Sequence, residues 1–405
     1  MTDSRPRVTV LAGFSPAATD AVARSLLVTD PTLILVAHDL RDGVVRHTVR
    51  SSDRVVEDDS TVVWEDVIPA LVRLSRRHPR SDLILALPPA VEPEAVAAAC
   101  AMSSVDGVAV TDAVRLDSFV TVVEAAGLLD DLTSTASLRD RDRHAAADDD
   151  RAVADVVGRQ IEFADTIVVW SSPEFDVLER DRLTALLHRL APWAAHVRIG
   201  DSPRVDCTAL AARLLRTGRH DPAVPGTLGR ALAGYPIGIH DPAGEHSVNA
   251  MLFHSRRPFH PRRLHDILDR LTNETLRGRG HLWIATQPDA AIGWESSGSG
   301  LRLGNLGGWL ASLPRERWAE ASDMRRLAAD ANWDPYYGDR TTALSFVGFD
   351  LDVEAMTAML RRCLLTDAEI ADGAERWHAF PDPFAGFFPT GSQQEPAAVS
   401  RGAAS

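Results

Sequence analysis

Short apolar runs separated by amphipathic stretches dominate the first half of the chain. An apolar run at residues 8–12 ends at a glycine, and an amphipathic segment at 19–27 leads to a second run at 33–37. A further amphipathic segment, 65–77, precedes the apolar run 82–87. Apolar runs that alternate with helical periodicity predict parallel strands joined by helices, so we expect an α/β fold with a parallel sheet.

The same alternation continues to about residue 219. It predicts strands at 107–114, 117–124, 166–170 and 197–199, and helices at 94–102, 152–163, 181–190 and 207–215. Residues 137–151 interrupt the pattern with alternating arginines and aspartates. Because this segment has no apolar spacing, we expect it to be a surface connection that buries nothing.

The pattern changes after residue 247. Alternating apolar residues around Met251 and Phe253 predict a strand, and a turn follows at 257–258. An amphipathic helix is expected from Pro261, with Leu264, Ile267, Leu268 and Leu271 on one face. Further strands are predicted at 282–285, 290–294 and 343–348, and a helix at 353–363. This mixture predicts a second, small α+β domain.

Composition shifts suggest where the domains meet. Proline, glycine and small residues dominate the stretch after His220, which is typical of a connection between domains. We therefore expect one domain over 1–219, a linker over 220–247, a second domain over 248–388 and a disordered tail over 389–405.

Composition and charge limit the function classes. The 405 residues, of which 45% are hydrophobic, suffice for two ordinary cores. The formal net charge of −14 argues against a general nucleic-acid surface, and no DNA partner is expected. No apolar run reaches the roughly 18 residues that cross a bilayer, and MTDSRPRV does not resemble a signal peptide. We expect a cytoplasmic protein without membrane contact.

Cysteine and lysine usage bears on metal and phosphate chemistry. Cys100, Cys207 and Cys363 are far apart and form no CxxC motif, so no local motif predicts a structural zinc site. The chain contains no lysine, and all 43 basic residues are arginine. A phosphate site that depends on a lysine ammonium group therefore cannot form.

Several segments carry a recognisable family pattern. In the second half these are FHSRRPFH at 253–260, GHLWIATQPD at 280–289, WDPYYGDR at 333–340 and LLTDAE at 364–369. In the first half they are DSFVTVVE at 117–124 and QIEFAD at 160–165. The chain resembles the CobW family, in which a P-loop GTPase domain precedes a small α+β domain and which is associated with zinc and cobalt handling. The resemblance implies a P-loop-GTPase-like parallel sheet followed by a CobW C-terminal domain.

The first loop departs from the family's Walker A sequence, GxxxxGKT or GKS. Backbone N–H groups of a Walker A loop surround the phosphates, its lysine reaches them and its hydroxyl holds magnesium. Here the loop reads GFSPAATD, without the second glycine or the lysine. Pro16 removes a backbone donor and Asp20 adds a negative charge. Gly13, Ser15 and Thr19 remain as candidates for a degenerate phosphate loop.

Other family motifs are also missing. No cysteine stands in residues 54–64, where the family has a CxCC metal motif, and the acids 57–59 there favour a solvated turn over a cation site. Pro88 and Pro89 replace the glycine turn near the γ-phosphate, and residues 170–173 read WSSP in place of NKxD. We therefore expect a pseudo-GTPase with no catalytic residue, no metal ligands and no bound nucleotide.

A cluster of arginines is a candidate interaction site. Arg256, Arg257, Arg262 and Arg263 lie close together in the sequence with Phe259 among them. Such a segment on an acidic protein suits RNA phosphate or an acidic partner surface, and salt bridges to the domain's own acids are an equal alternative. We expect His254, His260 and His265 to have a structural role and not to bind a metal. We expect His240 and His246 to be polar loop residues and not metal ligands.

Two hypotheses for the function follow from the resemblance. Degenerate nucleotide motifs beside an intact second domain resemble actinobacterial members that recruit a ribosome hibernation factor when zinc is scarce. That resemblance implies a non-catalytic adaptor whose partner is the hibernation factor or the ribosome. The alternative is a GTP-dependent zinc metallochaperone, a GTP hydrolase that uses GTP, Mg²⁺ and Zn²⁺. The adaptor predicts no nucleotide binding, whereas the metallochaperone predicts a zinc affinity that depends on nucleotide.

Overall fold

The chain divides into two compact units. They comprise residues 1–183 with 193–223, and residues 184–192 with 224–405. The computed structural model describes residues 5–41, 44–51, 55–61, 67–144, 146, 148–172, 175–200, 205–298 and 300–388, and it leaves out the side chains of 39–47 and 55–61. The expected tail 389–405, the side chains of the acids 57–59 and much of the segment 54–64 thus lie outside the described residues.

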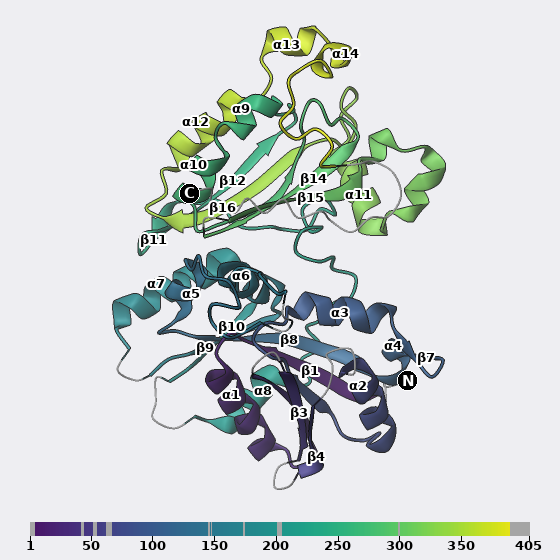
Figure 1. Cartoon of the computed structure of the whole chain (residues 1–405), viewed down its shortest axis with the longest axis vertical. Coiled ribbons are helices and arrows are strands. Elements are labelled where there is room, and N and C mark those ends of the chain that lie inside the picture. The colour runs from purple at the N-terminus through teal and green to yellow at the C-terminus, as the bar shows by residue number, and fades with distance from the viewer. Residues whose placement is uncertain are drawn as a thin grey trace. The chain divides into compact units, whose positions relative to one another are not determined.

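A mixed sheet forms the centre of the first unit. Its strands are β1 (Arg7–Ala12), β2 (Ile34–Arg41), β3 (Val44–Arg50), β4 (Val55–Thr61), β5 (Leu83–Ala86), β8 (Arg115–Glu124), β9 (Thr166–Trp170) and β10 (Ala195–Ile199). The described strands run in the order β10-β9-β8-β1-β5-β2-β3-β4. Neighbours from β10 to β2 are parallel, and β3 and β4 continue the sheet as antiparallel strands (Figure 1). The predicted α/β class with a parallel sheet is confirmed.

Helices cover both faces of this sheet. They are α1 (Pro16–Thr29), α2 (Val67–Arg77), α3 (Pro93–Met102), α4 (Val110–Ala113), α5 (Leu128–Leu132), α6 (Val153–Phe163), α7 (Val177–Leu190) and α8 (Cys207–Leu214). Val8 and Val10 of β1 are buried in one core with α2 and α3, whereas Leu11 is buried in another with α1 and α8. Because both faces are covered, the parallel strands β1, β5 and β9 are near-continuous apolar runs, and the apolar pattern identifies them. The sequences of β3 and β4 are more polar, and the pattern does not predict these two strands.

Two expectations for this unit are wrong. Residues 107–114 form a short strand, β7 (Val108–Ala109), and the turn of helix α4, because Asp106 and Gly107 with φ of 52° and 75° make a tight turn after β6 (Ser104–Val105). The segment 137–151 does bury an apolar side chain, since Leu138 is fully buried. Arg151 fixes the end of this segment by pairing with Asp149 at 2.8 Å.

An antiparallel sheet forms the centre of the second unit. Its strands are β11 (Asp241–Glu245), β12 (Val248–Ser255), β13 (Arg277–Leu282), β14 (Ala290–Ser297), β15 (Gly300–Gly308) and β16 (Thr342–Phe349). The described strands run in the order β11-β12-β16-β13-β14-β15. β13 ends at Leu282, where the apolar pattern predicts a strand to begin, and β11 lies inside the stretch expected to be a linker.

Helices connect the strands of this second sheet. They are α9 (Pro261–His265), α10 (Leu268–Glu274), η2 (Leu310–Ser312), η3 (Arg315–Glu320), α11 (Asp323–Ala331), α12 (Val353–Cys363), α13 (Asp367–Ala371) and α14 (Ala374–Trp377). The single helix expected from Pro261 is two helices, interrupted at 266–267. α9, α10 and α12 share a core with Phe253 and Leu344, so they cover the sheet face to which those side chains point (Figure 1).

Within the described residues, no helix combines the length and the apolar character that spanning a bilayer requires.

A buried ion pair joins two strands of the second sheet, and its loss is expected to be costly. Arg277 on β13 and Glu295 on β14 are 2.6 Å apart, and each side chain is 2% exposed. Glu295→Gln removes the charge that faces a buried guanidinium group, and we expect unfolding in urea to show a loss of about 3 kcal/mol. Glu274→Gln, from the exposed pair with Arg270, is the control, with an expected change of about 0–1 kcal/mol. Equal midpoints for the two variants would refute the prediction.

Candidate functional site

A pocket of about 320 Å³ opens at the carboxyl ends of β1 and β8. The chain leaves β1 through residues 13–15 into α1, which packs with α8 on one face of the sheet. It leaves β8 toward α5 and then α6, which packs with α3 on the other face. Neighbouring parallel strands whose connections leave to opposite faces create a crevice at their carboxyl ends, the usual ligand position in such sheets.

The candidate phosphate loop borders this pocket, but its groups are engaged within the loop. Ser15 lines the pocket, and its hydroxyl caps α1 by accepting the Ala18 N–H at 3.4 Å. Thr19 is buried, and its hydroxyl donates to the Ser15 carbonyl at 2.9 Å. Gly13 makes a close approach, because a Cβ there would lie 2.5 Å from the Val122 carbonyl oxygen. Of the three candidates, Ser15 is the one placed on the pocket wall.

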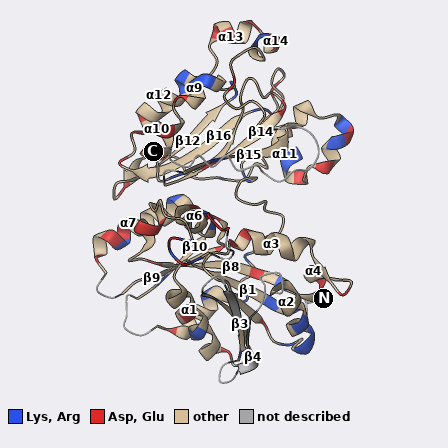
Figure 2. Ribbon diagram, viewed as in Figure 1, with Lys and Arg blue, Asp and Glu red and all other residues tan. Residues whose placement is uncertain are grey.

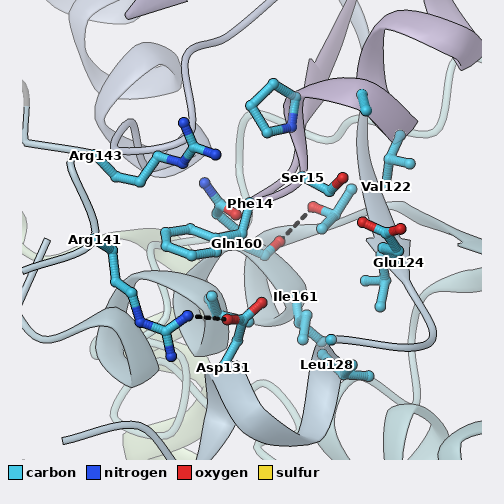
Figure 3. Close-up of a pocket in the computed structure, with 16 residues that line it drawn as sticks. Phe14, Ser15, Val122, Glu124, Leu128, Asp131, Arg141, Arg143, Gln160 and Ile161 are labelled. Carbon is cyan, nitrogen blue, oxygen red and sulfur yellow. Dashed lines mark hydrogen bonds and ion pairs between the residues drawn. The ribbon is translucent and has the colours of Figure 1, made fainter. Parts of the chain in front are cut away.

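Charged side chains from other segments reach the pocket as well. Figure 3 shows Arg141 facing Asp131, and these two groups are 3.9 Å apart. Arg143 also lines the pocket, and Glu124 does so from the end of β8. Burial raises the pKa of the Asp131 carboxyl group to about 6, with contributions from the negative charges of Asp130 and Glu124, while Arg141 and Arg143 oppose the rise.

This arrangement does not fit a magnesium nucleoside triphosphate held in the usual way. Thr19 stands where a Walker A loop has its lysine, and its hydroxyl is bonded to the Ser15 carbonyl group. Asp20 stands where the loop has the hydroxyl that holds magnesium, and Pro16 offers no N–H. Asp131 and Glu124 bring carboxylates to the pocket, and these would repel phosphate oxygens. The cationic groups are guanidinium groups from residues 137–151, a segment that the sequence reasoning had not linked to the site.

Two motif segments of the first unit have structural roles. The Gln160 side-chain amide donates to the carbonyl groups of Pro89 at 2.9 Å and Val91 at 3.0 Å, so it holds the turn after β5. At the end of β9, the Ser171 N–H donates to the Ile199 carbonyl at 2.9 Å. These hydrogen bonds therefore fasten the carboxyl edge of the sheet.

The candidate arginine cluster lies on the second unit, at the end of β12 and in α9 (Figure 2). Arg257 pairs with Asp367 at 2.6 Å and Arg263 with Glu369 at 2.7 Å, as the salt-bridge alternative expects. Phe259 is fully buried and stacks on Phe253 with ring centroids 6.0 Å apart. Phe259 therefore belongs to the core and cannot contribute to a contact surface.

Two members of the cluster remain. A guanidinium nitrogen of Arg256 donates to the Asn332 carbonyl group. Arg262 forms no ion pair within the described part of the chain. The interaction prediction for the cluster thus rests mainly on Arg262.

The histidines of this region take part in packing. His260 caps α9 by accepting the Arg263 N–H at 3.4 Å, and its ring stacks on Phe380 with centroids 4.7 Å apart. The His265 ring meets the Phe384 ring edge-on with centroids 5.8 Å apart. Across the described residues, no group of three or more histidine, cysteine, aspartate or glutamate side chains is placed to hold a metal ion.

Known proteins resemble this chain along most of its length. The family model for the cobalamin synthesis protein cobW C-terminal domain matches residues 248–364. Zinc chaperone Rv0106 of Mycobacterium tuberculosis is 33% identical over 390 residues, which cover 90% of each chain. Zinc-regulated GTPase metalloprotein activator 1 of Dictyostelium discoideum is 28% identical over 284 residues, 67% of this chain and 57% of that protein. Among solved structures, the Zn(II)-bound YjiA GTPase from E. coli aligns with 90% of this chain and 100% of its own, at 13% identity and a TM-score of 0.38.

The raised pKa of Asp131 predicts a pH-dependent effect on stability. Its pKa rises from 3.8 to about 6 on folding, so its contribution is fully present below pH 3.8 and is lost as the pH rises through 6. Asp131→Asn removes this loss, and we expect the variant to be more stable than the parent above pH 6 by roughly 1 kcal/mol after allowance for solvent screening.

Urea unfolding of both proteins from pH 4 to pH 8 measures this difference. The exposed Asp112→Asn is the matched control, and its difference from the parent should not change with pH. A difference for Asp131→Asn that is also independent of pH would mean that Asp131 has an ordinary pKa.

Proposed function

This chain belongs to the CobW family, and within that family we propose that it acts in zinc homeostasis without transferring a phosphoryl group. The first part of the proposal draws on the names of two relatives, one a zinc chaperone and the other a zinc-regulated GTPase metalloprotein activator. The second part draws on the pocket of the first unit.

The charge distribution of that pocket is the observation that carries the proposal. Glu124 and Asp131 line it, and the chain has no lysine to place among the phosphates. Thr19 keeps its hydroxyl inside α1. A triphosphate with Mg²⁺ would therefore meet carboxylates where it needs N–H donors and an ammonium group, and its binding is disfavoured.

Two mechanisms are compatible with a role in zinc homeostasis. In the first, the protein is a non-catalytic adaptor that brings a ribosome hibernation factor to the ribosome when zinc is limiting. The pocket chemistry supports this reading, because it requires no nucleotide. In the second, the protein is a GTP-dependent zinc metallochaperone, and the names of the relatives support this reading more directly.

Calorimetric titration with GTP and Mg²⁺, in the presence and absence of zinc, separates the two mechanisms. We expect no saturable heat at millimolar GTP, because the carboxylates of Glu124 and Asp131 would repel the phosphates and the chain has no lysine to hold them. Micromolar binding that changes with zinc would overturn the adaptor and establish the metallochaperone reading.

The adaptor also predicts association with ribosomes from zinc-starved cells. We expect the protein to sediment with these ribosomes. We also expect Arg262→Glu to lower the bound fraction severalfold, because it reverses the charge of an exposed arginine of the cluster. Arg213→Glu, an exposed change of equal charge on α8, is the control. Equal sedimentation of both variants would exclude Arg262 from the contact, and no sedimentation of the parent would exclude the adaptor.

A further inference from the structure

The second unit contains a cavity of about 600 Å³ to which the proposed function assigns no role. It lies on the face of the antiparallel sheet opposite α9, α10 and α12. This placement follows from the alternation of side chains along a strand, since Phe253 and Leu344 face those helices and their neighbours His254 and Ala343 line the cavity. Residues 231–238 and α11 form the other walls.

Two imidazole groups flank the floor of this cavity. His254 on β12 and His281 on β13 are both paired in register with Ala343 on β16, which lies between them. Residues directly opposite one another in adjacent strands point to the same face of a sheet. The methyl group of Ala343 thus leaves open space between two histidines that lie on one row across the sheet.

His281 is a buried polar group for which the structure supplies no partner. Its side chain is 2% exposed, its ring meets the Trp309 ring edge-on with centroids 5.5 Å apart, and neither ring nitrogen has a hydrogen-bond partner among the described residues. Burial, together with the nearby positive charges of His254 and Arg325, lowers the pKa of His281 to about 3. The neutral ring offers one donor and one acceptor, and leaving them unmet costs about 1–3 kcal/mol each.

One guanidinium group, Arg256, and one carboxylate, Asp339, line the cavity. One guanidinium nitrogen of Arg256 donates to the Asn332 carbonyl group, and the other terminal nitrogen is buried with no partner among the described residues. The two oxygens of Asp339 accept the N–H groups of Leu310 at 2.9 Å and Ala311 at 2.8 Å, so this carboxylate is committed to the backbone. Burial lowers the pKa of Arg325 as well, with partial relief from Asp339. An anion in the cavity would therefore supply a partner for the buried nitrogen of Arg256, while the Asp339 carboxylate is already held by backbone N–H groups.

We propose that this cavity binds a small organic anion, whose carboxylate or phosphate group meets Arg256 and the ring of His281. The apolar part of the ligand contacts Leu252, Ile237 and Ala343, which also line the cavity. The volume lies within the range of about 300–1,000 Å³ that is typical of small-molecule sites. This site is independent of the pocket in the first unit and of the choice between adaptor and metallochaperone.

Benzoate and phenyl phosphate are suitable probes, because they join the same ring to a carboxylate or to a phosphate. Each is titrated into the full chain by calorimetry, at constant ionic strength and with benzyl alcohol as the neutral comparison. We expect at least one of the two anions to bind saturably at millimolar concentration or below and to raise the unfolding temperature, while benzyl alcohol does neither. The stronger of the two identifies the anionic group that the site prefers.

Variants distinguish anion binding in this cavity from adventitious anion binding elsewhere on the protein. Arg256→Gln removes the cationic donor, and we expect it to weaken binding of the preferred anion about tenfold or more. Arg361→Gln, an exposed position on α12 at the opposite face of the sheet, should leave binding unchanged. His281→Phe keeps a ring of similar size without nitrogen and should also weaken binding, and Arg256→Gln decides the matter if that variant does not fold.

Three results would overturn the proposal. They are the absence of saturable binding of either anion at millimolar concentration, equal binding of an anion by Arg256→Gln and the parent, and stabilisation by Zn²⁺ alone where neither anion stabilises. In the first case, water molecules satisfy the nitrogens of His281.

Discussion

A reversal of winding at β1 determines where the first unit can bind anything. The chain that leaves β1 turns to the face covered by α1 and α8, and the chain that leaves the neighbouring β8 turns to the face of α3 and α6. The crevice between them exists because of connectivity, whatever side chains line it. Gly13 is needed for this arrangement, since any Cβ would meet the Val122 carbonyl group. The fold thus fixes the position of the pocket, and the lining residues decide its chemistry.

The charged side chains that line the pocket differ from those of a P-loop. Every basic residue of the chain is arginine, and the two that reach the pocket, Arg141 and Arg143, come from the connection between β8 and α6. That connection is held in place by its own polar contacts, among them Arg151 with Glu92 at 2.8 Å and the Ser137 N–H with Asp140 at 2.8 Å. The described part of this connection therefore brings positive charge to the pocket, where Arg141 faces the carboxylate of Asp131.

Elements whose burial follows a simple period could be predicted from the sequence. The helix 353–363 and the strand 166–170 coincide with α12 and β9, because each presents apolar side chains at the spacing of its own type. β13 could not be predicted in this way. Its sequence RGRGHL is polar, yet all of it is buried, since Arg277 meets Glu295 on the next strand and glycines allow close approach. The buried charge of Arg277 is compensated by Glu295, which is distant in the sequence, so the local pattern around β13 does not indicate its burial.

The candidate sites also contain some residues that the sequence could locate and others whose position depends on tertiary packing. The loop at Gly13 could be located from its place between a strand and a helix, and Ser15 does reach the pocket. Asp131 and Arg141 could not be paired in advance, because neither belongs to a motif and their proximity depends on the tertiary path. The prediction for Phe259 was wrong because its neighbours in the sequence are charged, whereas its side chain points into the core.

Contacts and buried side chains beyond residue 364 show how far the second unit extends as a folding unit. The family match ends at residue 364, but Arg257 and Arg263 reach across to Asp367 and Glu369. Glu369 also completes the capping box of α13, and Trp377 and Phe388 are buried in the unit's cores. A boundary drawn from similarity alone would therefore cut through the packed interior. A fragment that retains all the buried side chains of these cores therefore extends at least to Phe388.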